Sequence, residues 1–257
     1  VAIPRGVLLR GDEEPSEEIA AWQGFFLKAQ VLEGGRGKSG LVRRLSNIGE
    51  FRAARRLILA TLDDADTPLL LEEAVPIARE IFLSLRIDGT RQCLEFLLAP
   101  EGGEDVEQSK KLARVPLEDE VATVVEQVFP AAADLFSRAL AARLSRYAAR
   151  LLDIARAEDL QLLEINPLVL AEDGSLIACD AKIIRDDAAD FRHDAADFGL
   201  CRLLAERGIT ATERAARDLG FQLVETDGNV VLVTSGAGLA MMMMDLLADH
   251  GLRAASF

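Results

Sequence analysis

A β-hairpin is predicted by the sequence LQLLEINPLVLAEDGSLIACDAK, residues 160–182. Two apolar runs flank the turn at 172–174, where Gly174 supplies the positive φ that a three-residue connection requires. A turn of that length fixes the register of the two strands, and it places Asn166 directly opposite Asp180. The two strands are therefore expected to present an amide and a carboxylate to each other.

The same register sets Glu164 opposite Lys182, and the period of two along a strand places both polar pairs on one face of the hairpin. Directly opposed Cβ atoms lie about 5 Å apart in such a ladder. At that spacing the oxygens of Asn166 and Asp180 are suitable hard ligands for Mg²⁺, with phosphate and water completing the shell. The alternative is a solvated face held by a hydrogen bond and an ion pair. A slip of one residue at the turn would remove the direct pairing on which the metal prediction depends.

A glycine-rich loop, EGGRGKSG at residues 33–40, follows a predicted strand at 25–32. Its glycines match the dinucleotide-binding pattern GxGxxG, but that pattern requires a helix directly after the loop, and residues 41–45 predict a returning strand. A Rossmann-type oxidoreductase is therefore disfavoured, and a Walker A loop fails because its first glycine would fall on Leu32. The loop is interpreted as a glycine hairpin that covers a polyphosphate, with an ordinary basic turn as the alternative. The cations expected to assist are Lys28, Arg36 and Lys38.

The 257 residues carry a formal net charge of −14 and are 50% hydrophobic, enough apolar material for one or two packed domains. The negative charge argues against nucleic acid and against an anionic membrane surface as partners. No apolar run reaches the roughly 18 residues of a membrane span, and no secretory leader opens the chain. Three cysteines without metal-ligand spacing fit a reducing compartment, so we expect a cytoplasmic protein. Because the chain lacks an initiating methionine, we also expect a fragment.

Predicted strands and helices alternate along the chain, which indicates an α/β (α+β) fold. The acids Glu72, Glu73 and Glu80 at the exit of one strand are either surface groups or acceptors for the hydroxyls of a nucleotide. The predicted strands lie at 25–32 and 69–75, in hairpins at 81–99 (with an Asp88-Gly89 turn) and 160–181, and in a strand, glycine turn and helix from residue 230. The other predicted helices lie at 47–62, at 119–157 with an interruption near Pro130, and at 197–219.

Four segments together resemble the β subunit of succinyl-CoA synthetase, within the wider family of nucleotide-dependent acyl-CoA ligases. They follow the order of that family and span nearly the whole chain. The segments are KAQVLEGGRGK at 28–38, PEGG at 100–103, LEINPLV at 163–169 continuing to DAK at 180–182, and DGN at 227–229 with GAGLAM at 236–241.

The resemblance implies an ATP-grasp fold at residues 1–205, in which two lobes hold ATP or GTP. It also implies that residues 206–257 are the truncated start of a flavodoxin-like CoA-ligase domain. The implied phosphate-binding residues are Lys28, Gly35, Arg36 and Gly37. The implied base and ribose contacts are Glu72, Glu80 and the backbone of Val75, and the implied Mg²⁺ ligands are Asn166 and Asp180.

The reaction implied by the resemblance joins succinate to CoA, reversibly, as in the tricarboxylic acid cycle. The γ-phosphoryl group of ATP would pass to a histidine of a separate α subunit and then to the acid, while Mg²⁺ and cations neutralise its charge. Glu164 is implied to orient that histidine, so neither His193 nor His250 is assigned its role. Ser235 stands where the family has an asparagine that contacts the acid. Another dicarboxylate such as malate is therefore an alternative substrate, and a non-catalytic nucleotide-binding homologue is the alternative function.

Overall fold

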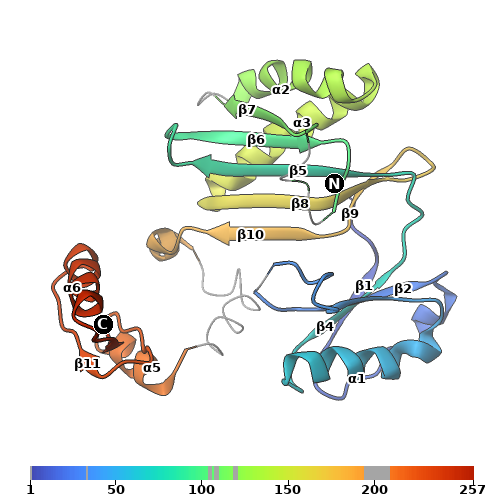
Figure 1. Ribbon diagram of the computed structural model, residues 1–257. Helices are drawn as coiled ribbons and strands as arrows, with labels where there is room; N and C mark the ends of the chain where they lie inside the picture. Colours follow the sequence, from blue (N-terminus) through green and yellow to red (C-terminus); the bar gives the residue numbers. More distant parts are fainter. Residues whose placement is uncertain (1, 33, 104–105, 107–109, 118–120, 194–208) are drawn as a thin grey trace. The chain divides into compact units, whose positions relative to one another are not determined.

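The chain folds into two compact units, Val1–Ala195 and Ala196–Phe257. The structure is a computed structural model, and it describes residues 2–32, 34–103, 106, 110–117, 121–193 and 209–257 (Figure 1). The domain boundary expected between residues 205 and 206 lies outside the described residues.

A four-stranded sheet forms the first lobe of the first unit, with the strand order β1-β4-β2-β3. Its core is made by apolar residues that alternate along the strands and by the inner face of helix α1, including Phe25, Leu27, Ile58 and Leu71. The strands are β1 (Gly6–Leu9), β2 (Phe25–Ala29), β3 (Val42–Leu45) and β4 (Leu69–Glu73), and the helices are α1 (Phe51–Leu62) with the 3₁₀ turns η1 (Glu17–Ala21) and η2 (Ile48–Glu50).

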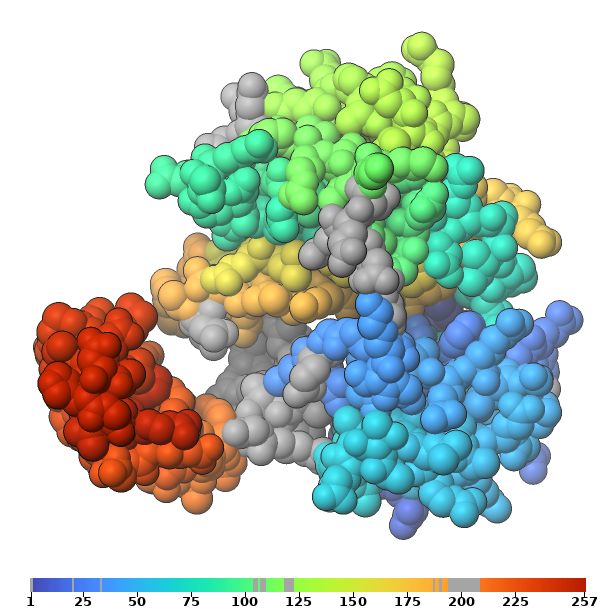
Figure 2. Space-filling view, viewed as in Figure 1, coloured from blue at the N-terminus to red at the C-terminus, as the bar shows by residue number. Residues whose placement is uncertain are grey.

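The second lobe is a six-stranded sheet in the order β10-β8-β5-β6-β7, with β9 paired to β8. Helices α2 and α3 cover one face of this sheet (Figure 1), and Figure 2 shows the yellow-green atoms of the helices packed directly against the strands. The odd residues Ile81, Leu83 and Leu85 of β5 point into that helical core, so the even residues of β5 lie on the opposite face. The elements are β5 (Arg79–Asp88), β6 (Cys93–Ala99), β7 (Ala113–Leu117), α2 (Val121–Leu135), α3 (Arg138–Ala157), β8 (Leu160–Leu170), β9 (Leu176–Ala178), β10 (Ala181–Arg185) and η4 (Asp187–Arg192).

One local prediction is wrong, and the predicted hairpin at 81–99 forms with its turn displaced by one residue. Helix α2 continues through Pro130 and ends at Leu135; the break comes later because the Ser137 side chain accepts a hydrogen bond from the backbone N–H of Leu140 and starts α3 there. In the β5–β6 hairpin the left-handed residue is Gln92, with φ 55°, rather than Gly89. The loop spans residues 89–92, because Asp88 pairs with Cys93. It is therefore longer than a two-residue Asp-Gly turn.

In the second unit two short strands pair in parallel, and a helix lies between them in the sequence. This agrees with the strand, glycine turn and helix expected from residue 230 onward. Part of the helical stretch predicted at 197–219 lies outside the described residues, and the described part contains α5, which begins with a Thr210–Glu213 capping box. The elements are α5 (Ala211–Asp218), β11 (Val230–Val231), α6 (Ala237–Asp249) and β12 (Ala254–Ser256). Within the described part of the chain, no helix is both long and apolar enough to cross a membrane.

Candidate functional site

The hairpin of β8 with β9 and β10 has the register predicted from its turn. Glu164 pairs with Lys182, and the backbone N–H of Asn166 donates to the carbonyl of Asp180 at 3.2 Å. Gly174 takes a φ of 82° at the turn. Asn166 and Asp180 therefore face each other across the two strands, as the metal prediction requires.

Lys28 is the buried cation of this region. Its Nζ lies 2.5 Å from Oε2 of Glu72 on the neighbouring strand and donates to the carbonyl of Cys179, also at 2.5 Å. The two charged side chains are only 10% and 12% exposed. A buried charge is stable only when it is paired, so this contact holds β2 and β4 of the first lobe to the hairpin of the second.

The glycine loop closes a second bridge between the lobes. It is a turn followed by strand β3, and residues 34–45 contain no helix, which excludes the Rossmann arrangement at this loop. Gly35 takes a φ of 72°, and the backbone N–H of Leu41 returns to the carbonyl of Arg36 at 2.9 Å. From this turn Nη2 of Arg36 reaches both carboxylate oxygens of Asp180 at 2.6 Å, and Nη1 donates to the carbonyl of Ala29.

Asn166 is held by a reciprocal pair of hydrogen bonds. Its Oδ1 accepts from the backbone N–H of Gly103 at 2.9 Å, and its Nδ2 donates to the carbonyl of the same residue at 3.0 Å. Glycine is favoured next to this contact, because a Cβ on Gly102 would lie 3.1 Å from Cβ of Glu80 and 3.2 Å from Cβ of Pro167, which is tighter than ordinary van der Waals contact. The amide oxygen of Asn166 keeps a second lone pair for a further ligand.

The donor set at Asn166 and Asp180 fits Mg²⁺ on chemical grounds, since both offer hard oxygens. Among the described residues no group of three or more His, Cys, Asp and Glu side chains is arranged to hold a metal ion. These two residues would therefore need phosphate oxygens and water to complete a shell, and Arg36 would have to leave Asp180.

The thiol of Cys179 lies among the charged groups of this region. Burial raises the pKa of Cys179 to about 11, with smaller contributions from Lys28, which lowers it, and from Glu72, Glu80 and Asp180, which raise it. Cys179 is therefore a neutral thiol at physiological pH and does not act as a nucleophile. Because the charge of Glu80 acts on this thiol, Glu80 lies near Cys179 and belongs with Lys28, Glu72 and Asp180 to one cluster of charged residues.

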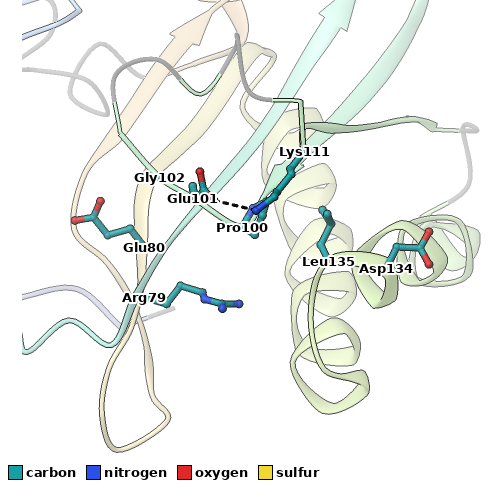
Figure 3. Close-up of a pocket in the computed structure, with 8 residues that line it drawn as sticks. All are labelled: Arg79, Glu80, Pro100, Glu101, Gly102, Lys111, Asp134 and Leu135. Carbon is teal, nitrogen blue, oxygen red and sulfur yellow. Dashed lines mark hydrogen bonds and ion pairs between the residues drawn. The ribbon is translucent and has the colours of Figure 1, made fainter.

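A cavity of about 580 Å³ adjoins this cluster and shares Glu80 and Gly102 with it. In Figure 3 the Glu80 carboxylate points away from the Arg79 guanidinium, and Lys111 reaches Glu101 across the loop. Nζ of Lys111 and Oε1 of Glu101 are 3.2 Å apart. Sequence reasoning missed this cavity, although the PEGG segment that contributes to it was recognised. The lining residues are Arg79, Glu80, Pro100, Glu101, Gly102, Lys111, Asp134 and Leu135.

Four further residues named from the sequence make none of the contacts described above. Ser235 is exposed in the loop before α6, in the second unit. His193 lies 2.7 Å from Asp159 through its Nε2, and Nδ1 of His250 contacts the carbonyl of Leu246 at 2.8 Å within its own helix. Val75 is half-buried just after β4.

Comparison with known proteins decides the family. Residues 1–170 match the model of the ATP-grasp domain. The chain is 34% identical over its whole length to the succinate–CoA ligase (ADP-forming) β subunit of Syntrophotalea carbinolica, covering 69% of that protein. It is 35% identical to the corresponding subunit of Zymomonas mobilis, with 91% of this chain and 64% of that protein aligned. The chain belongs to the succinate–CoA ligase β-subunit family.

The fold agrees with this ATP-grasp CoA-ligase family. An ATP citrate lyase from Methanothrix soehngenii, solved with citrate and coenzyme A, superposes with a TM-score of 0.69 over 98% of this chain and 64% of that protein, at 16% identity. A dinucleotide-forming acetyl-coenzyme A synthetase from Ca. Korarchaeum cryptofilum superposes over 72% of this chain with a TM-score of 0.53, at 18% identity. The family, the ATP-grasp fold and the ligase class predicted from the sequence are confirmed.

Proposed function

We propose that this chain is the nucleotide-binding β subunit of an ADP-forming acid–CoA ligase that produces succinyl-CoA. The observation that supports it most is the convergence of two lobes on one set of charged residues. Lys28 and Arg36 of the first lobe contact the second lobe at Cys179 and Asp180. A nucleotide would bind here with its phosphates replacing these direct contacts, between cations from one lobe and oxygen ligands from the other.

Each charged group has a distinct role in this proposal. Lys28 and the loop residues Gly35, Arg36 and Gly37 bind the phosphates, because cations and backbone N–H groups are the donors that phosphate oxygens accept. Glu72 and Glu80 accept hydrogen bonds from the base and ribose, next to the backbone of Val75.

Asn166 and Asp180 would hold Mg²⁺ in this site. When bound, the ion neutralises negative charge on the phosphoryl group that is transferred. The chain prepares its ligands in two ways: the backbone of Gly103 orients the amide of Asn166, and Arg36 shields the carboxylate of Asp180 until the phosphates draw the guanidinium away.

The rest of the proposed reaction requires a separate α subunit. The γ-phosphoryl group of ATP passes to a histidine of that subunit, which Glu164 orients, and then to the carboxylate of the acid. The CoA thiol attacks the acyl phosphate, so that a thioester forms and phosphate leaves. We assign the nucleotide site to an ATP-grasp domain at residues 1–205 and residues 206–257 to the beginning of the CoA-ligase domain, in a cytoplasmic enzyme.

Ser235 is the proposed contact for the acid. Its hydroxyl is shorter than the asparagine side chain that the family resemblance places here, so Ser235→Asn is expected to raise succinate-dependent turnover of the α–β complex. Turnover is measured with succinate and with malate at equal concentrations. The conservative Ser235→Thr variant keeps the hydroxyl and serves as the control. An unchanged ratio of the two rates in Ser235→Asn would show that this position does not select the acid.

Calorimetric titration tests the proposed function directly. The chain is titrated with ATP, GTP and NADH, each with and without Mg²⁺. We expect Mg²⁺-dependent binding of ATP or GTP and no binding of NADH. Absence of nucleotide binding, both alone and with the α subunit present, would contradict the proposal and favour a degenerate homologue.

A further inference from the structure

Three arginines gather on the face of the second sheet that the helices leave uncovered. Val115, Phe96 and Leu85 point into the helical core, so their neighbours Arg114, Glu95 and Arg86 lie on the face opposite α2 and α3. We call this the open face, although Val106 and Leu112 pack on part of it, over Phe82 and Leu97. On this face Arg86 pairs directly with Glu95 across β5 and β6.

Glu95 is a buried carboxylate at the centre of this arginine cluster, and its side chain is 2% exposed. Arg86 donates to Oε2 of Glu95 from Nη2 at 3.0 Å and from Nε at 3.2 Å. Arg91 reaches Oε1 and Arg114 reaches Oε2, both at 3.4 Å. The carboxylate thereby holds three like charges close together.

The arginine cluster has more positive charge than Glu95 neutralises. Oδ2 of Asp88 also lies 3.8 Å from Nε of Arg91, so two carboxylates face three guanidinium groups and leave one positive charge, in a chain whose net charge is −14. The Arg86, Arg91 and Arg114 side chains remain 35%, 56% and 45% exposed. Each guanidinium carries five N–H donors, so donors remain for an anion approaching from solvent.

Ser84 adds a second, independent observation on the same face. It lies two residues before Arg86 on β5 and is 1% exposed, yet its Oγ has no hydrogen-bond partner among the described residues. A buried hydroxyl without a partner is rare and is explained most simply by a group that is absent from the structure. Ser84 also pairs with Glu164 on β8.

The arginine cluster therefore adjoins Glu164, the residue proposed to meet the phosphorylated histidine. Leu163 and Ile165 point into the helical core, which places Glu164 on the open face. Arg86 is its diagonal neighbour, since Ser84 lies opposite Glu164 and Arg86 opposite Leu162. Diagonal neighbours in a sheet are within reach of long side chains such as arginine.

We infer that Arg86, Arg91 and Arg114, held by Glu95, form a binding site for a phosphate dianion on the open face of the sheet. The ligand is either orthophosphate or the phosphoryl group carried by the partner subunit, since both present the same oxygens to the guanidinium groups. The inference rests on the proposed function for its biological context. Its arginines are different residues from Lys28 and Arg36, which are assigned to the nucleotide phosphates.

Titration with orthophosphate at constant ionic strength tests the site, with the nucleotide site filled by Mg²⁺ and a non-hydrolysable ATP analogue. Arg114→Gln is expected to weaken orthophosphate binding about tenfold or more, because it removes a charged donor. Arg52→Gln makes the same change at an exposed arginine of α1 and serves as the control. Arg91→Gln, at the most exposed member of the cluster, provides a second variant if Arg114→Gln does not fold.

The results distinguish the two sources of phosphate. They also distinguish failure of this inference from failure of the proposed function. If the partner subunit is the source, Arg114→Gln raises the KM for the phosphorylated partner in phosphoryl transfer to ADP and leaves kcat unchanged. If orthophosphate is the source, that KM is unaffected while orthophosphate binding is lost. Orthophosphate affinity equal to wild type in both Arg114→Gln and Arg91→Gln would overturn the inference. Loss of analogue binding in the wild-type chain would instead count against the proposed function.

Discussion

Lys28→Met is expected to destabilise the protein by about 3–5 kcal/mol and to abolish ATP binding. The substitution removes the partner of Glu72 in a buried ion pair and leaves an uncompensated carboxylate, which is the costly way to break such a pair. It also removes the donor to the carbonyl of Cys179. Urea denaturation measures the free energy of unfolding, and calorimetry measures ATP affinity.

Two variants separate the structural role of Lys28 from its binding role. In Lys28→Met/Glu72→Gln the buried charge is gone, so we expect most of the stability to return while ATP binding stays lost. Arg5→Met removes the cation of an exposed ion pair with Glu73, the residue next to Glu72 on β4, and is expected to change stability little. Recovery of ATP binding in the double variant would contradict the assignment of Lys28 to the phosphates.

The sequence was sufficient to predict interactions that are set by local geometry. The turn at 172–174 fixes the pairing of Glu164 with Lys182, because a three-residue connection with Gly174 at positive φ allows one register only. The returning strand after the glycine loop was also predicted from local sequence, because apolar and basic residues follow the loop and no signal for the start of a helix occurs there. Both predictions are confirmed by the structure.

Interactions between distant parts of the chain were not predictable in this way. Arg36 and Asp180 are 144 residues apart, and neither segment by itself indicates that the Arg36 guanidinium forms an ion pair with the Asp180 carboxylate. The burial of Glu95 likewise depends on arginines from three different positions in the chain, Arg86, Arg91 and Arg114.

Asp180→Asn is expected to lower the affinity for ATP in the presence of Mg²⁺ by about 100-fold or more and to remove the dependence of binding on the ion. Asparagine keeps the shape of the side chain but removes the negative charge, so that the site would offer the cation two neutral amide oxygens and no carboxylate. Asp173→Asn makes the same change in the exposed turn of the same hairpin and is expected to bind Mg²⁺ and ATP as the wild type does. Calorimetry with and without Mg²⁺ gives both affinities.

The ion pair of Arg36 with Asp180 is expected to affect metal binding in the absence of nucleotide. Because the guanidinium lies 2.6 Å from both carboxylate oxygens, Mg²⁺ without nucleotide must compete with it. Arg36→Gln is therefore expected to strengthen Mn²⁺ binding to the nucleotide-free chain, measured by electron paramagnetic resonance, while it weakens ATP binding by removing a phosphate donor. The affinities for Mn²⁺ and ATP change in opposite directions only if Arg36 pairs with Asp180 before the nucleotide binds and with the phosphates afterwards. A parallel loss of both affinities would show that Arg36 supports the loop and does not shield Asp180.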